Sequence, residues 1–360
     1  MRRKNLIATL GTVILLVVLI ASLVACGTPA PTTSAPTSAA PTSAAPAKVY
    51  TMKMWIQNPE TAWQAVPIKK WIGNLETKSK GQIKIQPFWN ESLMPGKESI
   101  NGLKGGLYDI SAQLQTFNNP GEFPVSDVSN LPFMATSMKG SILGLRALYD
   151  ANLMPEYVGK GFKLLDFQAP GMQYLIFKNK QIDTLDGLKG LKIRSQTPTT
   201  VDMIKSWGAT PVALPSGDVY MSLDRGVIDA ALSSPGFMAP FKFYEVAKFF
   251  LDQPLYGGNM WIGMYQKTWD SLTPDLQKVV VDETRAFTED WITVSTQQED
   301  VGSKDVLKKN GVTFYNFKAG ELDKIKAATA PVIDAFIKKM NDAGMDGKKI
   351  VDTFRAAQPK

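Results

Sequence analysis

Arg194 is the residue whose type and position most directly suggest a chemical role. It ends a short run in which apolar and polar residues alternate, and turn-forming and helix-starting residues, Ser195, Thr197 and Pro198, follow it. A guanidinium presents its N–H donors in one plane, and this fork matches the two oxygens of a carboxylate. An arginine at the end of a strand therefore predicts a site for a carboxylate ligand.

The segments after Arg194 alternate between helix and strand patterns. A second apolar run covers Thr210–Leu214, and a third, Val227–Leu232, follows a helix-like segment that Gly226 ends. Short connections between such runs are typical of open α/β sheets, in which ligands bind outside the carboxyl ends of the strands. The sequence therefore predicts that Arg194 lies at a ligand-binding edge of a sheet.

Several segments form a pattern that is more specific than any single motif. In the best-matched region they are Asp186–Arg194, Trp207–Val212, Asp218–Leu223 and Gly226–Asp229. Further matches, in the same order along the chain, are Gly81–Ile85, Leu131–Phe133 and Trp269–Lys278. Together they resemble the DctP-type substrate-binding subunits of tripartite ATP-independent periplasmic (TRAP) transporters. The resemblance implies an α/β, periplasmic-binding-protein-like fold, with two α/β lobes joined by a hinge and a ligand cleft between them.

The resemblance also implies roles for individual residues. In this family the arginine that corresponds to Arg194 binds the ligand carboxylate. Gln173 stands where many members have a second arginine, and we expect its amide to hydrogen-bond the ligand. Near Ser233, many members have an asparagine that fixes the ligand, and keto-acid binders have a glutamate beside a metal. This chain has neither, so Ser233 offers only a hydroxyl, and Leu232 cannot hold a cation. We therefore expect no metal and no cofactor, and a monocarboxylate in preference to a dicarboxylate.

Three aromatic residues near predicted strand ends are open to two interpretations. Trp55 ends the first predicted strand, and Tyr256 and Trp261 flank Gly257–Asn259. Core packing is the ordinary role of such residues, but at loop openings they could also cover the apolar part of a bound acid. All three are therefore candidate ligand-binding residues.

The composition excludes several classes of function. The chain has 360 residues with 44% hydrophobic residues, enough for a substantial core, and it contains no histidine and one cysteine. Catalysis by Ser-His-Asp or Cys-His groups, His-ligated metals and disulfides are therefore excluded. Of the net charge of +7, three charges come from Arg2, Arg3 and Lys4 at the start, and the other basic residues are interspersed with acidic ones. This pattern favours a solvated surface over a nucleic-acid interface.

The amino-terminal residues have the pattern of a bacterial lipoprotein. Residues 1–25 combine a basic start with an apolar run, and Cys26 follows small residues. We expect a cleaved signal peptide, a lipid on Cys26 and a solvated tether over 26–47. An uncleaved membrane helix is the alternative, because the apolar run is long. Both interpretations place the rest of the chain outside the cytoplasmic membrane, and the first predicts a lipid anchor.

Residues 48–360 are predicted to form two lobes. Residues 48–171 plus 257–300 form lobe I, and residues 172–256 plus 301–360 form lobe II and the hinge helices. The strand patterns begin at Leu107 and at Val227, each after a glycine. Near the carboxyl end, the pattern predicts a long helix over 275–298 and a separate helix over 301–307.

Three functions are compatible with these features. The first is an extracytoplasmic solute receptor, not an enzyme, that delivers a small organic acid to membrane permease subunits. The second is a secreted lipoprotein hydrolase that uses Asp218 and Asp229 as acid and base. The third is a lipoprotein that senses a ligand and signals.

Overall fold

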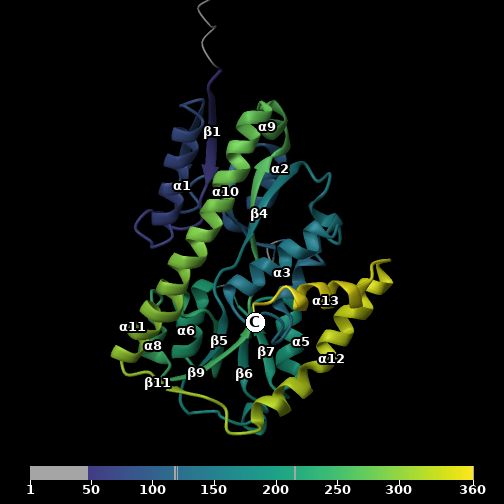
Figure 1. Ribbon diagram of the computed structural model, residues 1–360. Coiled ribbons are helices and arrows are strands. Elements are labelled where there is room, and N and C mark those ends of the chain that lie inside the picture. Colours follow the sequence, from purple (N-terminus) through teal and green to yellow (C-terminus); the bar gives the residue numbers. More distant parts are fainter. Residues whose placement is uncertain (1–47, 117–118, 120, 215, 360) are drawn as a thin grey trace, which may run out of the picture. The chain divides into compact units, whose positions relative to one another are not determined.

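The computed structural model describes residues 48–116, 119, 121–214 and 216–359 (Figure 1). The predicted signal peptide, the predicted lipid on Cys26 and the predicted tether 26–47 concern residues outside this part. Within it, two mixed sheets flanked by helices confirm the predicted α/β class.

The first sheet has five strands in the order β2-β1-β3-β10-β4. The strands are β1 Tyr50–Trp55, β2 Ile83–Phe88, β3 Ile110–Leu114, β4 Phe162–Gln168 and β10 Met260–Tyr265. β1 pairs in parallel with β2 and β3, whereas β10 runs antiparallel to both of its neighbours. β10 thus joins a sheet whose other strands come from the first half of the chain.

The second sheet has six strands in the order β11-β9-β5-β8-β6-β7. The strands are β5 Gln173–Phe177, β6 Lys192–Ser195, β7 Thr210–Ala213, β8 Ala230–Ser233, β9 Phe249–Tyr256 and β11 Thr313–Tyr315. β6 is parallel to β7 and β8, and β5 is antiparallel to β8 and β9. The chain passes between the two sheets after β4, again after β9, and a third time between β10 and β11. The predicted boundaries of the two lobes, and the lobe to which each helix belongs, stay a prediction.

A glycine turn precedes one buried strand in each sheet. Gly106 and Gly226 have φ angles of +72° and +69°, which glycine adopts without strain. The strands that follow, β3 and β8, begin at Ile110 and Ala230. The predicted strand starts at 107 and 227 were therefore wrong, because the first residues after each glycine complete the turn.

An aspartate stabilises each of these strand starts. The Asp109 carboxylate accepts a hydrogen bond from the backbone N–H of Lys53 at 2.8 Å. The Asp229 carboxylate accepts one from the backbone N–H of Lys192, also at 2.8 Å. The two sheets therefore share a local design in which an aspartate satisfies a backbone donor of the neighbouring strand.

Helices cover both sheets. Their bounds are α1 Ala65–Lys78, α2 Ser99–Gly105, α3 Met138–Asp150, α4 Leu185–Leu188, α5 Pro198–Ser206, α6 Val219–Asp224, α7 Pro235–Met238, α8 Phe243–Val246, α9 Gln266–Ser271, α10 Pro274–Ser295, α11 Lys304–Lys309, α12 Glu321–Asp342 and α13 Gly347–Ala356.

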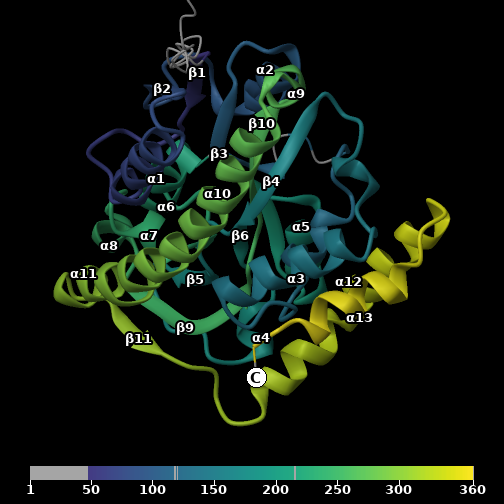
Figure 2. The same cartoon turned by 45° about the horizontal axis from the view of Figure 1, so that its top comes forward.

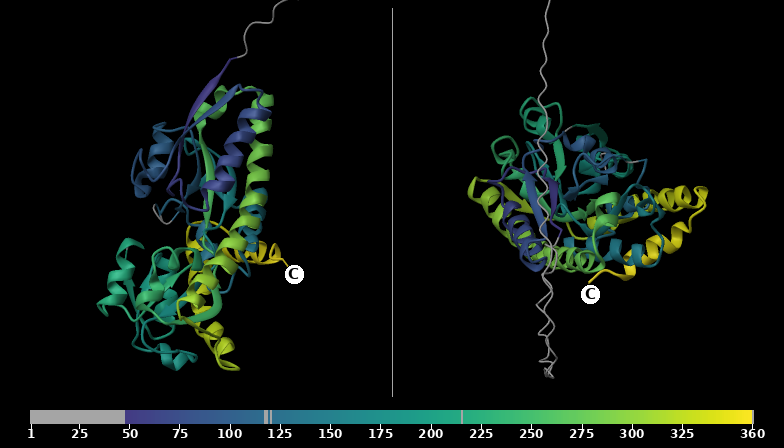
Figure 3. Two further views of the ribbon diagram at one scale, coloured as in Figure 1. Left: turned by 90° about the vertical axis from the view of Figure 1, so that its left-hand side faces the viewer. Right: turned by 90° about the horizontal axis from the view of Figure 1, so that it is seen from above.

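The long helix α10 packs along α1 and β4 (Figures 1 and 3). The Thr273 side chain caps its first turn by accepting a hydrogen bond from Leu276 N, and Pro274 fits the first helical position. Its buried residues recur at helical spacing and include Leu276, Val280, Thr284, Phe287 and Trp291. Phe287 stacks on Trp71 of α1, with ring centroids 4.7 Å apart. This stripe holds the helix against the first sheet.

A buried ion pair joins α10, α3 and β4. Both carboxylate oxygens of Asp166 accept hydrogen bonds from Arg146, at 2.8 Å from Nε and 2.7 Å from Nη2. Thr288 of α10 donates to the same carboxylate at 2.9 Å. Burial lowers the pKa of Arg146, but the hydrogen bond and charge of Asp166 outweigh it, and the pKa is raised. Asp166 therefore holds three elements together.

The break predicted between residues 298 and 301 is absent. α10 continues into a π-helical turn, Thr296–Ser303, and then directly into α11. Gly302, near the start of the second predicted helix, lies within this wide turn. The two predicted helices are therefore one continuous helical segment.

The last two helices link the surroundings of the two sheets. α12 packs against α5, beside the second sheet, and α13 packs against α3, beside the first (Figure 2). The Gln358 amide donates to the carbonyl of Gly140 at 3.0 Å and accepts from the N–H of Thr136 at 3.2 Å. Gln358, just after α13, thus satisfies two backbone groups at the amino-terminal end of α3.

Candidate functional site

Four of the predicted ligand-binding residues meet at one edge of the second sheet. Arg194 lies near the carboxyl end of β6, Ser233 ends β8 and Tyr256 ends β9, while Gln173 begins the antiparallel strand β5. Gln173 pairs with Tyr256, and the next residue along β5 pairs with Ser233. The strand directions, which the sequence suggested only for part of the sheet, bring all four to the predicted edge.

Arg194 is buried within this edge, with 3% of its surface exposed. Its Nη1 donates to the carbonyl of Leu232 at 2.9 Å, and its Nε donates to the carbonyl of Leu214 at 3.3 Å. Burial lowers the pKa of Arg194 to about 10, and interaction with Tyr256 opposes this shift. The guanidinium therefore remains charged at neutral pH in surroundings that oppose its charge.

Gln196 joins this group, although the sequence did not single it out. Its Nε2 donates to the carbonyl of Leu232 at 3.1 Å and to Oε1 of Gln173 at 3.3 Å. Gln173 in turn donates from Nε2 to the carbonyl of Gly171 at 3.1 Å. Gln196 lies two residues after Arg194, and side chains two positions apart in an extended chain point to the same face. This spacing could have indicated that Gln196 belongs to the site. The two amides thus form a chain beside Arg194.

Two hydroxyls at this edge are buried without a partner among the described residues. They are Oη of Tyr256 and Oγ of Ser195, whose residues are 2% and 1% exposed. Burial is the main cause that raises the pKa of Tyr256, while the Arg194 charge opposes the shift and the Asp127 charge adds to it. A buried hydroxyl that lacks a partner is costly, so these positions suit hydrogen bonds to a ligand.

The structure places the two predicted tryptophans in the core of the first sheet. Trp55 is 1% exposed, and its Nε1 donates to the carbonyl of Met94 at 3.0 Å. Trp261 is fully buried, with Phe162 and Tyr157 at centroid distances of 4.5 and 5.5 Å. These contacts are the core packing that was the alternative interpretation, and ligand contact at either residue stays a prediction.

A contact near the site joins a turn beside the first sheet to α5 and was not expected from the sequence. Asp127 belongs to a 3-10 turn, Ser126–Asn130, beside the first sheet, and its carboxylate accepts hydrogen bonds from Thr199 and, at 2.8 Å, from Asn130. Thr199 lies in the first turn of α5, directly after β6. Asp127 thus carries a negative charge close enough to affect Tyr256.

A second carboxylate holds the turn that carries Asp127. Glu156 is 5% exposed and accepts hydrogen bonds from Val125 N at 3.0 Å and from both N and Oγ of Ser126 at 2.8 Å. Burial raises the pKa of Glu156 to about 7, against the effect of these hydrogen bonds. The folded protein therefore binds a proton here that the unfolded chain, with a carboxyl pKa near 4.5, has already lost.

We expect the free energy of unfolding to fall between about pH 4.5 and pH 7. In this window the folded state binds more protons than the unfolded state at Glu156, so stability decreases as the pH rises, by up to about 3 kcal/mol. Glu156→Gln should remove this contribution. Urea unfolding at several pH values from 4.5 to 8 measures the slope, and equal slopes for both proteins would show that Glu156 does not titrate there.

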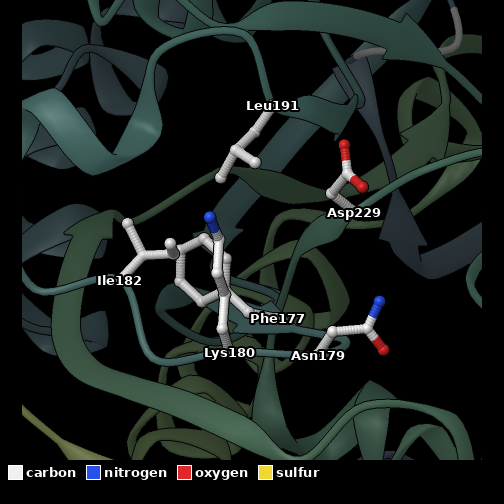
Figure 4. A pocket seen from close by; sticks show the side chains of 6 residues that line it. All are labelled: Phe177, Asn179, Lys180, Ile182, Leu191 and Asp229. Carbon is white, nitrogen blue, oxygen red and sulfur yellow. The ribbon is translucent and has the colours of Figure 1, made fainter.

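The described residues also line a pocket at the opposite edge of the second sheet. Figure 4 shows Lys180, Ile182 and Leu191 around the ring of Phe177, with Asp229 and Asn179 to one side, in a pocket of about 220 Å³. Phe177 is the last residue of β5, and Asp229 precedes β8. This pocket therefore lies at the other ends of the strands from Arg194 and Ser233.

The structure gives Asp229 a structural role. Its carboxylate holds the start of β6 through Lys192, as described above. Asp218, the other carboxylate of the hydrolase hypothesis, is exposed at the start of α6. These placements do not support joint acid and base catalysis.

Two features are absent from the described part of the chain. No helix there combines the length and the apolar character that crossing a membrane requires. No group of three or more metal-binding side chains occurs there. Binding without a metal stays a prediction.

Comparison with known proteins identifies the family. Residues 56–339 match the family model described as bacterial extracellular solute-binding protein, family 7, or DctP. The 2,3-diketo-L-gulonate-binding periplasmic protein of Escherichia coli is 27% identical over 234 residues, which is 64% of this chain and 70% of that protein.

Solved structures agree with this result. A TRAP solute-binding protein from Rhodoferax ferrireducens T118, in complex with copurified benzoate, has 25% identity and a TM-score of 0.76, over 86% of this chain and 97% of that one. A marine metagenome TRAP solute-binding protein with 3-hydroxybenzoate has 24% identity and a TM-score of 0.77, over 86% and 98%. These structures confirm the predicted two-lobe fold. The chain is thus a member of the DctP family, the extracytoplasmic solute receptors of TRAP transporters.

Proposed function

We propose that this receptor binds a small monocarboxylate through Arg194 and delivers it to its membrane permease subunits. The observation that carries the proposal is the buried guanidinium near the carboxyl end of β6, at the edge of the second sheet where we expect the ligand. Burial lowers the pKa of Arg194, and a bound carboxylate would restore the electrostatic stabilisation that the charge loses on burial.

The neighbouring groups favour a ligand with one carboxylate and a weakly polar body. Gln173, Ser233 and Tyr256 offer neutral hydrogen-bonding groups. The aromatic ring of Tyr256 also suits the apolar body of a ligand. The charge of Asp127 acts on Tyr256, so a second carboxylate in that direction would meet repulsion. Benzoate and 2,3-diketo-L-gulonate, which the names of two relatives record, each have one carboxylate.

A thermal-shift screen tests this proposal. Benzoate, 3-hydroxybenzoate, glucuronate and pyroglutamate represent monocarboxylates, and succinate and malate represent dicarboxylates, each with and without sodium and calcium. A monocarboxylate present at 100 times its Kd should stabilise the folded state by about 2.7 kcal/mol, and cations should not change this effect. Stabilisation only by dicarboxylates, or only with a cation, would contradict the proposed ligand class.

We also propose that a lipid on Cys26 anchors the receptor outside the cytoplasmic membrane. The support is the order of the basic start, the apolar run and the only cysteine of the sequence. The mature protein should begin at Cys26 with acyl chains attached, and Cys26→Ala should block processing. Mass spectrometry of the membrane-extracted protein measures both, and a mature protein without lipid would contradict the anchor.

A further inference from the structure

Glu299 lies in the helical segment after α10, where this segment packs against α7, the helix that follows β8. It belongs to the π-helical turn Thr296–Ser303, which continues α10 and packs against α7. α10 itself packs on α1 and β4, elements of the first sheet's surroundings. π-helical turns inside helices occur frequently at functional sites, because the inserted residue redirects the side chains around it. This turn carries the carboxylate of Glu299, a residue that is 4% exposed.

The carboxylate of Glu299 lies against two glycines from different segments. Its Oε2 accepts a hydrogen bond from the backbone N–H of Gly236 at 2.9 Å. A Cβ atom added at Gly236 would lie 2.0 Å from Oε1, and one added at Gly171 would lie 2.7 Å from Oε2. Gly171 also has a φ of +100°, a conformation that other residues rarely adopt. Both glycines are therefore required for this carboxylate to approach the backbone.

These two glycines adjoin the residues of the ligand site. Gly171 lies two residues before Gln173, and its carbonyl accepts the hydrogen bond from the Gln173 side chain at 3.1 Å. Gly236 lies in the first turn of α7, which begins directly after Ser233 and Ser234. One buried carboxylate thus contacts both chain segments that carry the neutral hydrogen-bonding side chains of the site.

We propose that Glu299 is a positioning residue of the ligand site. It fixes the backbone at Gly171 and Gly236, and so fixes the orientation of Gln173 and the position of Ser233 relative to Arg194. A glycine in an unusual conformation is flexible unless its surroundings restrain it, and the Glu299 carboxylate supplies that restraint at Gly171. Because the carboxylate is carried on the continuation of α10, it also links this site to a helix that packs on the first sheet. This inference rests on the proposed function for its effect on binding.

The test compares Glu299→Ala, Glu299→Gln and the matched control Gln297→Ala, an exposed residue of the same turn. The alanine variant loses the hydrogen bond to Gly236 and leaves a void beside Gly171, so the affinity for benzoate should fall about tenfold or more. The glutamine variant keeps an oxygen for Gly236 N–H, so it should lose no more than about threefold. Gln297→Ala should bind like the unchanged protein. Calorimetry well below each variant's melting temperature separates affinity from stability.

A double-mutant cycle with Gln173→Ala distinguishes positioning from general stabilisation. If Glu299 acts through Gln173, the loss in the double variant should be at least threefold smaller than the product of the two single losses. Losses that multiply, or an alanine variant with unchanged affinity, would overturn the inference.

Hydrogen exchange without ligand keeps this test independent of the proposed function. Glu299→Ala should speed exchange in peptides covering 169–177 and 233–240, with little change elsewhere. Faster exchange throughout the chain, or no change in these two peptides, would overturn the inference even if benzoate does not bind. Binding that is unchanged in Arg194→Ala would instead contradict the proposed ligand site, and would leave the exchange result standing on its own.

Discussion

Replacing Arg194 with alanine should weaken binding of the monocarboxylate by roughly 30-fold or more. Removing one member of a buried, hydrogen-bonded charge pair typically costs about 2–5 kcal/mol, because the partner charge stays buried without compensation. Arg194 meets this condition, since it is 3% exposed and its burial already lowers its pKa to about 10. Calorimetry with the most strongly stabilising acid of the thermal-shift screen measures the effect.

Two further variants sharpen the interpretation. Arg194→Lys keeps a positive charge but loses the planar fork, so it should recover only part of the affinity. Arg225→Ala removes an exposed arginine at the end of α6 and should bind normally. Near-native affinity of Arg194→Ala would show that the carboxylate binds elsewhere. Because a pKa of about 10 keeps Arg194 protonated, the affinity should not change between pH 6 and pH 8.

Replacing Asp166 with alanine should lower the free energy of unfolding by about 3–5 kcal/mol. The substitution leaves the guanidinium of Arg146 buried, with its side chain only 11% exposed, and removes the acceptor of Thr288. The loss would loosen α3 and α10 from β4 at once, since Asp166 bonds to both helices. Urea unfolding monitored by tryptophan fluorescence measures the change.

An exposed ion pair of the same helix provides the control. Asp282 pairs with Lys278 at 2.6 Å, but both side chains are more than half exposed. Exposed pairs contribute about 0–1 kcal/mol, so Asp282→Ala should change stability little. If Asp166→Ala were no more destabilising than this control, the buried network would not stabilise the fold as described.

The sequence patterns that predicted the strands and helices are short-range patterns. Glycines at positive φ, period-2 strands and helical stripes are determined by interactions between residues a few positions apart. For this reason the sequence predicted the strand and helix order, and it placed Arg194 at a strand end. The errors at Leu107 and Val227 arose because an apolar residue in a turn resembles the first residue of a strand.

The candidate site was predicted only in part, for a related reason. Gln173, Ser233 and Tyr256 come from strands whose neighbours in the sheet are distant in the sequence, and their meeting depends on the order β9-β5-β8-β6. The family resemblance supplied Gln173 and Ser233, whereas nothing in the sequence distinguished Tyr256 from Trp55.

By itself the sequence determined the α/β class, the strand-end arginine and the exclusion of histidine and disulfide chemistry, because these follow from residue types and short spacings. Only the tertiary structure decided that Gln196 joins Arg194, that Asp127 contacts Thr199 and that Glu299 lies against Gly171 and Gly236. Each of these contacts joins residues from different elements, and their energies depend on burial and distance, which short-range sequence patterns do not contain.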